Sequence, residues 1–187
     1  MKQSMRLGNG LSLTASGQLA AIHITRRFSV PSERVFSAWL EPVVAGQWLF
    51  ATALRPMTEV DIDARVGGAF RFAEQRYGEL TERTGKYIEI VPPRRLVFTL
   101  SMAERPRAST RVTVAISPLE AGCALTLTHE QVPLECASYL EGRWTGILYG
   151  LGAVLASTAG RNRSDRLNPS RGNRLSISLS TVRPVRT

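Results

Sequence analysis

The sequence contains only two cysteines and two histidines, and this scarcity excludes several classes of protein. Cys123 and Cys136 cannot build the disulfide framework that holds small secreted domains together. Neither cysteine has metal-ligand spacing to His23 or His129, so we expect no metal site. The sequence favours buried or incidental thiols.

The short motifs on which many enzymes and nucleic-acid-binding proteins depend are also absent. The chain has no phosphate-binding glycine loop, no nucleophile elbow, no paired zinc ligands and no stacked aromatic RNA-binding motif. With no activated nucleophile in view, we expect no catalytic residue and no cofactor. A non-enzymatic role is favoured, although the sequence leaves enzymatic activity open.

Long hydrophobic runs are missing too. The apolar run from Ile147 to Ala156 is far shorter than the roughly 20 residues that cross a bilayer. Residues 1–18 are polar, and their glycines and serines interrupt what would have to be the apolar core of a signal sequence. We therefore expect a cytoplasmic protein without a membrane span, and a flexible N-terminal extension over residues 1–18.

The positive charge is concentrated near the C-terminus. Residues 161–187 hold seven Arg and one Asp, which is +6 of the formal net charge of +9. The first 160 residues therefore carry only +3, with acidic and basic residues interspersed as on a solvated surface. We expect no specific nucleic-acid binding, and we predict that residues 160–187 form a disordered basic tail.

The chain of 187 residues, 43% hydrophobic and 21% charged, is typical of one globular domain, which we place at residues 19–159. Apolar and polar residues alternate from Ala20 to Val30, as in a strand with one buried face. Two short helical segments follow toward Trp48. The clearest hairpin surrounds Gly67-Gly68, and about six strands lie between the two short helical segments and the final helix.

The longest helical pattern lies between residues 134 and 159. Trp144, Leu148, Leu151 and Leu155 fall within about 60° of one another on a helix, which predicts one buried stripe. Pro133 allows the helix to begin, and Gly160 is expected to end it. A sheet with one apolar face and a helix with one apolar stripe bury each other, so the space between them is where we expect function.

Several ordered motifs carry a family resemblance. They are PSERVFSAW at Pro31–Trp39, VDIDARVGGAFRF at Val60–Phe72, GKYIEIVPPRRLVF at Gly85–Phe98, GCALTLTHE at Gly122–Glu130, and the helix of Trp144. Together, over about residues 20–158, they resemble the bacterial relatives of the activator of heat-shock-protein-90 ATPase. These proteins belong to the START-like (SRPBCC, helix-grip) superfamily.

The resemblance implies an α+β helix-grip fold. In such a fold a curved antiparallel sheet of about 6–7 strands wraps around a long C-terminal helix, two short helices follow the first strand, and a largely apolar cavity separates helix and sheet. Members of the superfamily bind lipids and other hydrophobic molecules, some cyclise polyketides, and the eukaryotic namesake binds a chaperone. Fold alone does not decide among these activities.

Our leading hypothesis is non-catalytic binding of a hydrophobic small molecule or lipid between the helix and the sheet. The alternatives are a chaperone-binding, ATPase-activator-like module and a polyketide cyclase or hydrolase. The residues expected to line the ligand site are mostly large and apolar: Trp39, Trp48, Phe50, Phe70, Phe72, Glu74, Phe98, His129, Trp144, Leu148 and Leu151.

The two polar candidates each have a simpler interpretation. His129 ends a strand on the side of Leu125 and Leu127, and a structural histidine bonded to backbone is favoured over a ligand contact. Glu74 continues the inner face of its strand with Arg76 beyond it, yet an acid at a strand end usually reaches water.

Two further interpretations concern surfaces. Because Ile88 and Ile90 should face the core, Tyr87 and Glu89 are expected to face solvent. Glycines 142, 146 and 150 form a small-residue stripe on the final helix, which leaves both a monomer and a homodimer open.

Overall fold

The computed structural model describes most of the chain between residues 18 and 167, with side chains up to residue 157. The described residues are 5–6, 12–13, 18–51, 57–76, 78–102 and 109–167. The predicted flexible N-terminal extension and disordered basic tail lie largely outside these ranges. Both therefore stay predictions.

Seven strands form one antiparallel sheet in the order β3-β9-β8-β7-β6-β5-β4, which confirms the predicted fold class. The strands are β3 (Leu19–Phe28), β4 (Glu59–Ile62), β5 (Ala69–Arg76), β6 (Glu79–Val91), β7 (Arg95–Met102), β8 (Thr110–Pro118) and β9 (Cys123–Pro133). The helices are α1 (Ser32–Ser37), α2 (Pro42–Ala45), the 3₁₀ turn η1 (Leu134–Cys136) and α3 (Ala137–Leu167). A separate two-stranded sheet pairs β1 (Met5–Arg6) with β2 (Ser12–Leu13).

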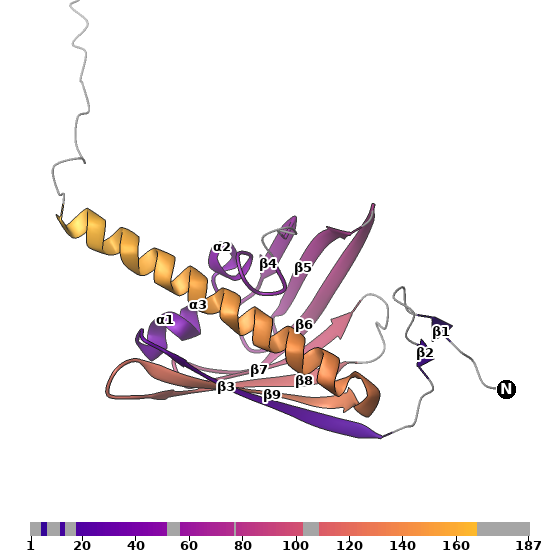
Figure 1. The fold of residues 1–187 in the computed structure, drawn as a ribbon. Coiled ribbons are helices and arrows are strands. Elements are labelled where there is room, and N and C mark those ends of the chain that lie inside the picture. Colours follow the sequence, from indigo (N-terminus) through magenta and orange to yellow (C-terminus); the bar gives the residue numbers. More distant parts are fainter. Residues whose placement is uncertain are drawn as a thin grey trace, which may run out of the picture.

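The sheet is bent, and α3 lies across its hollow side (Figure 1). Strands β3, β9 and β8 run beneath the helix, while β4 and β5 rise beside it near α2. Helix α1 contacts β8, and helix α2 contacts β4 at the far edge of the sheet.

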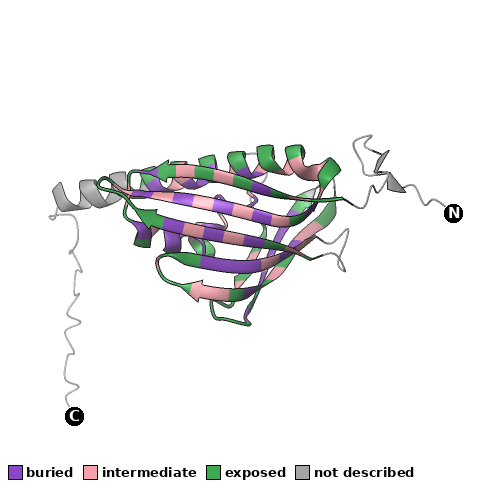
Figure 2. Ribbon diagram, turned by 90° about the horizontal axis from the view of Figure 1, so that it is seen from below, coloured by how far each residue is buried: buried purple, intermediate pink, exposed green. Residues whose placement is uncertain are grey.

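The alternating strands bury one face, as Figure 2 shows. On β8, Val112, Val114 and Ile116 are buried, and on β9 Leu125 and Leu127 are fully buried. These two strands pair in register, so their apolar side chains form one continuous surface toward α3. Burial of each such side chain stabilises the fold by about 1.5–3 kcal/mol.

Helix α3 buries the predicted stripe, with Trp144, Leu148, Leu151 and Leu155 all at most 4% exposed. The prediction that Gly160 ends this helix is wrong, because α3 continues to Leu167. A glycine within a helix costs only about 1 kcal/mol, and no proline stands between Pro133 and position 169 to stop the helix.

The prediction that Tyr87 faces solvent is wrong. Tyr87 is 4% exposed, and its neighbour Ile88 is 39% exposed. The register of β6 against β7 shifts between Tyr87 and Glu89, as in a β-bulge. Because the bulge inserts one residue, both Tyr87 and Ile90 pack on the core although they are three residues apart.

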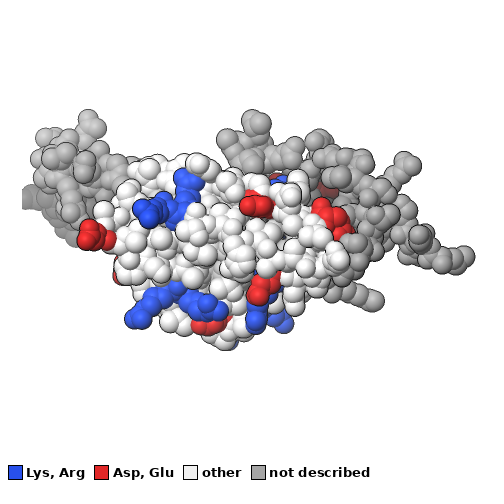
Figure 3. All heavy atoms as spheres, turned by 60° about the horizontal axis from the view of Figure 1, so that its bottom comes forward, with Lys and Arg blue, Asp and Glu red and all other residues white. Residues whose placement is uncertain are grey.

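Charges of both signs are scattered over the side of the molecule that Figure 3 turns toward the viewer. Two of the surface ion pairs, Arg95–Glu89 at 3.1 Å and Arg65–Asp63 at 2.8 Å, join side chains that are 41–78% exposed. Such pairs each contribute about 1 kcal/mol or less. This distribution agrees with a solvated surface.

Candidate functional site

Helix α3, the turn after α1 and the loop after α2 bring four aromatic rings together. The ring of Trp39 lies edge-on to Trp48, with 4.7 Å between centroids, and 6.5 Å from Trp144. The ring of Phe50 also lies near Trp144, with 5.9 Å between centroids. All four side chains are at most 5% exposed, so they form the helix side of a buried aromatic layer.

The sheet supplies the opposite side of this layer. Phe72 meets Phe50 edge-on at 5.5 Å, and Phe70 meets Phe98 at 5.5 Å. Tyr87 completes the set, 5.5 Å from Phe70. We call these residues the aromatic cluster: Trp39, Trp48, Phe50, Phe70, Phe72, Tyr87, Phe98 and Trp144. All except Tyr87 were predicted, and Leu148 and Leu151 of α3 pack in the same core.

A buried ion pair lies at one end of the cluster. Arg83 Nη2 donates to Glu74 Oε1 at 2.9 Å, and the two side chains are 7% and 6% exposed. The expectation that Glu74 reaches water is therefore wrong. The side chain of Arg76, its expected neighbour, lies outside the described residues.

Arg83 is the functional candidate that the sequence did not reveal. It is paired with Phe72 in the β5–β6 register, and its guanidinium carbon lies 5.2 Å from the centroid of the Phe50 ring. Arg83, Gly85 and Tyr87 occupy alternate positions of β6. The strand pattern in the sequence begins only at Gly85, whereas β6 begins at Glu79, so the inward direction of Arg83 was not predicted.

Two buried donors of the site have no hydrogen-bond partner in the part of the chain that the structure describes. They are Arg83 Nη1 and Trp39 Nε1. The other two tryptophans differ, since Trp48 Nε1 donates to the Ala38 carbonyl at 3.1 Å and Trp144 Nε1 donates to His129. Buried donors are nearly always paired, and an unpaired one costs about 1–3 kcal/mol.

The backbone of Phe50 adds a second unusual feature. Its φ is 65°, in the left-handed region that residues with a side chain seldom adopt. Such a conformation costs about 1–2 kcal/mol and is concentrated at functional sites. Here it places the aromatic ring against Arg83, Phe72 and Trp144 at once.

His129 links the helix to the sheet. Its Nδ1 accepts from Trp144 Nε1 at 2.9 Å, so Nε2 carries the proton and donates to Thr110 Oγ1 at 2.7 Å. The Thr110 hydroxyl donates in turn to the Leu100 carbonyl. His129 is thus structural, as favoured, but its partners are two side chains rather than backbone, and neither nitrogen is free for a ligand.

The electrostatics of His129 agree with this role. Burial lowers its pKa from 6.5 to about 4, because the charged imidazolium would be desolvated. The neutral ring is also the form that the hydrogen-bond chain requires, since protonated Nδ1 could not accept from Trp144. At neutral pH His129 is therefore uncharged.

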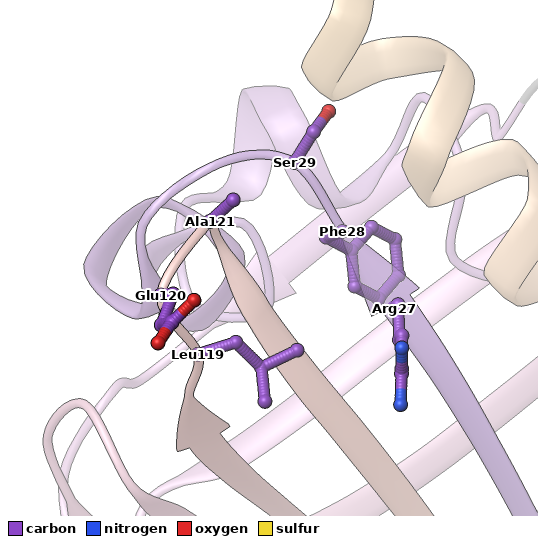
Figure 4. Close-up of a pocket in the computed structure, with 6 residues that line it drawn as sticks. All are labelled: Arg27, Phe28, Ser29, Leu119, Glu120 and Ala121. Carbon is purple, nitrogen blue, oxygen red and sulfur yellow. The ribbon is translucent and has the colours of Figure 1, made fainter.

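The surface has a hollow that none of the cluster residues lines (Figure 4). It is open to solvent and lies between the end of β3 and the β8–β9 turn. Its lining residues are Arg27, Phe28, Ser29, Leu119, Glu120 and Ala121. None of them was a predicted site residue, and in Figure 4 they form no converging set of polar groups.

Comparison with known families matches the chain over residues 29–156 to the model described as Activator of Hsp90 ATPase homolog 1-like protein. The match includes the whole aromatic cluster, the Glu74–Arg83 pair and the buried part of α3. The chain belongs to this family.

Solved structures of similar proteins cover the same region. A protein of Chromobacterium violaceum is 28% identical, with a TM-score of 0.64, over 72% of this chain and 95% of its own. A protein of Rhodobacter sphaeroides is 26% identical, with a TM-score of 0.65, over 75% and 97%. An AHSA1-like protein of Aeromonas hydrophila, 20% identical with a TM-score of 0.64 over 75% and 94%, shares the fold. The comparison with curated proteins found no match.

Membership of this Hsp90-activator-like family brings a START-like fold, which suggests a ligand-binding domain. Among the described residues no group of three His, Cys, Asp or Glu is placed to hold a metal ion. No helix in the described ranges is both long enough and apolar enough to cross a membrane. The aromatic cluster with its buried polar pair is the candidate site.

Proposed function

We propose that this protein binds a hydrophobic small molecule or lipid between α3 and the sheet, without catalysing a reaction. One observation carries the proposal: Trp39 Nε1 and Arg83 Nη1 are buried donors, within an otherwise aromatic layer, that have no partner among the described residues. A guest with an acceptor oxygen would satisfy such a donor while its apolar part contacts the rings.

The chemistry of the neighbouring groups supports binding rather than catalysis. His129 is neutral and uses both ring nitrogens in protein contacts. Cys123 is fully buried, and burial raises the pKa of its thiol, so it remains protonated at neutral pH. Neither residue has the properties of an activated base or nucleophile.

Tryptophan fluorescence is a local reporter of this site, because all three tryptophans of the chain belong to the aromatic cluster. We expect at least one compound from a panel of lipids and neutral aromatic molecules to change the fluorescence in a saturable way. If no compound in the panel gives a saturable change, the proposal is wrong.

The contribution of the free indole donor can be isolated with one variant. Trp39→Phe keeps an aromatic ring but removes Nε1, so a ligand that accepts from it should bind several-fold more weakly. Tyr139→Phe removes a hydroxyl from a side chain that is 59% exposed on α3, and serves as the matched control. Equal weakening in both variants would argue against a ligand at Trp39.

A further inference from the structure

The charge balance at Arg83 restricts the polar group that a ligand can carry. Arg83 contributes one positive charge and Glu74 one negative charge, and they meet at 2.9 Å with both side chains at least 93% buried. The pair is therefore already neutral. What remains for a ligand is one guanidinium donor, Nη1, without a partner among the described residues.

Each kind of ligand group has a different electrostatic consequence at this donor. A carboxylate or phosphate would bring the buried site to a net negative charge, which is unfavourable without a further cation. An ammonium group would be repelled by the guanidinium and would bring the buried site to a net positive charge. An uncharged oxygen accepts from Nη1 and leaves the site neutral.

The surroundings of Arg83 define the rest of the ligand. The guanidinium carbon lies 5.2 Å from the centroid of the Phe50 ring. The centroid of the Phe72 ring lies 5.5 Å from that of Phe50. The left-handed backbone of Phe50 holds its ring in this position. An apolar body therefore has aromatic surface to contact directly beside the free donor.

We infer that the ligand is a largely apolar molecule whose polar group is an uncharged acceptor, such as a ketone or ester carbonyl, bound by Arg83 Nη1. The Glu74 carboxylate selects against carboxylic acids of the same shape. This inference rests on the proposed function and names the ligand class of the same site.

Three probes with one ring system test the inference directly. They are 2-acetylnaphthalene, which offers a carbonyl, 2-naphthoate, which offers a carboxylate, and 2-ethylnaphthalene, which offers no acceptor. In equilibrium dialysis at pH 7.5 the wild-type protein should bind the ketone about tenfold or more tightly than either other probe. A tenfold ratio of affinities is what one hydrogen bond to a charged donor is expected to add to binding.

Two sets of variants test whether the preference for the ketone depends on Glu74 and Arg83. Glu74→Gln leaves Arg83 with an uncompensated charge, so the preference should reverse toward 2-naphthoate. The double variant Glu74→Met with Arg83→Met removes the donor without leaving a buried charge unpaired, and should bind ketone and ethyl probe equally. The ion pair between Glu89 of β6 and Arg95 is half-exposed and supplies the matched controls. The single variant Glu89→Gln matches Glu74→Gln, and the double variant Glu89→Met with Arg95→Met matches the double variant at the site. They should keep the wild-type preference.

The comparison of probes on the wild-type protein requires no variant to fold. Equal or tighter binding of 2-naphthoate than of the ketone would overturn the inference and leave the proposed function standing. A preference for the ketone that survives in the double variant would also overturn it, because Arg83 would then not be the donor. If the broader panel and all three probes fail to bind, the proposed function itself is wrong.

Discussion

The link between His129 and Trp144 predicts how the stability of the protein depends on pH. In the folded state the pKa of His129 is about 4, whereas an exposed histidine has a pKa of 6.5. Between these two values the unfolded chain binds a proton that the folded chain does not bind. Stability is therefore fully present above pH 6.5 and falls as the pH is lowered toward 4.

The size of this effect follows from the shift in pKa. A shift of one pKa unit corresponds to about 1.4 kcal/mol, so the drop from 6.5 to about 4 makes the free energy of unfolding about 3 kcal/mol smaller at pH 4 than at pH 7.5. A protonated His129 would also lose the acceptor that holds the indole of α3. The loss is a large fraction of the 5–15 kcal/mol roughly typical of a domain.

Urea denaturation at several pH values between 7.5 and 4 measures the effect. Acidic residues titrate in the same range, so the informative quantity is the difference between the wild-type protein and His129→Gln, which cannot titrate at this position. We expect the wild-type protein to lose about 3 kcal/mol more than His129→Gln over this range.

The chain supplies its own control in its second histidine. His23 is exposed on the edge strand β3, so His23→Gln controls for the loss of a histidine side chain at the surface. Identical pH dependence of the wild-type protein and His129→Gln would refute the reasoning. A folded-state pKa for His129 near 6.5 by NMR titration would refute it independently.

Three further predictions test the packing of the site. Gly85→Ala should lower the free energy of unfolding by about 2 kcal/mol or more in urea denaturation, because a Cβ there would clash with the Thr99 carbonyl and the Phe70 ring; an unchanged midpoint would contradict the close approach. Leu151→Ala removes a fully buried side chain and should cost about 2–5 kcal/mol in the same assay, whereas a cost below 1 kcal/mol would show that the core there is loose. A thiol reagent should modify Cys136 but not Cys123 in the folded protein, giving one reactive thiol per chain and two after unfolding; rapid modification of both would contradict the burial of Cys123.

The aromatic part of the site was predictable because local sequence patterns place it. Phe70 and Phe72 alternate with polar residues, and Trp144 shares a helical stripe with Leu148 and Leu151. In each case the period of the element determines which side chains point inward. The long sequence distance between Trp39 and Trp144 did not matter, because the helical pattern of Val35, Phe36 and Trp39 and that of α3 each predict a buried side chain.

The polar part of the site was not predictable in the same way. The β-bulge after Tyr87 shifts the alternation of β6, so a reading with strict period two places Tyr87 on the wrong face. Arg83 precedes the apolar pattern that predicts this strand from Gly85, so its inward position on β6 was not predicted either. Bulges depend on how a neighbouring strand pairs, and the sequence of one strand does not record this.

The sequence by itself determined the order of the elements, the helix-grip fold and the apolar wall between helix and sheet, since these follow from periodicity and from the family motifs. Only the tertiary structure decided that Glu74 is buried against Arg83, that His129 accepts from Trp144, and that two buried donors have no partner in the described part of the chain. The physical reason is that burial and hydrogen bonding of a polar group depend on atoms brought together from distant elements. Alternation shows which way a side chain points, but not what it meets there.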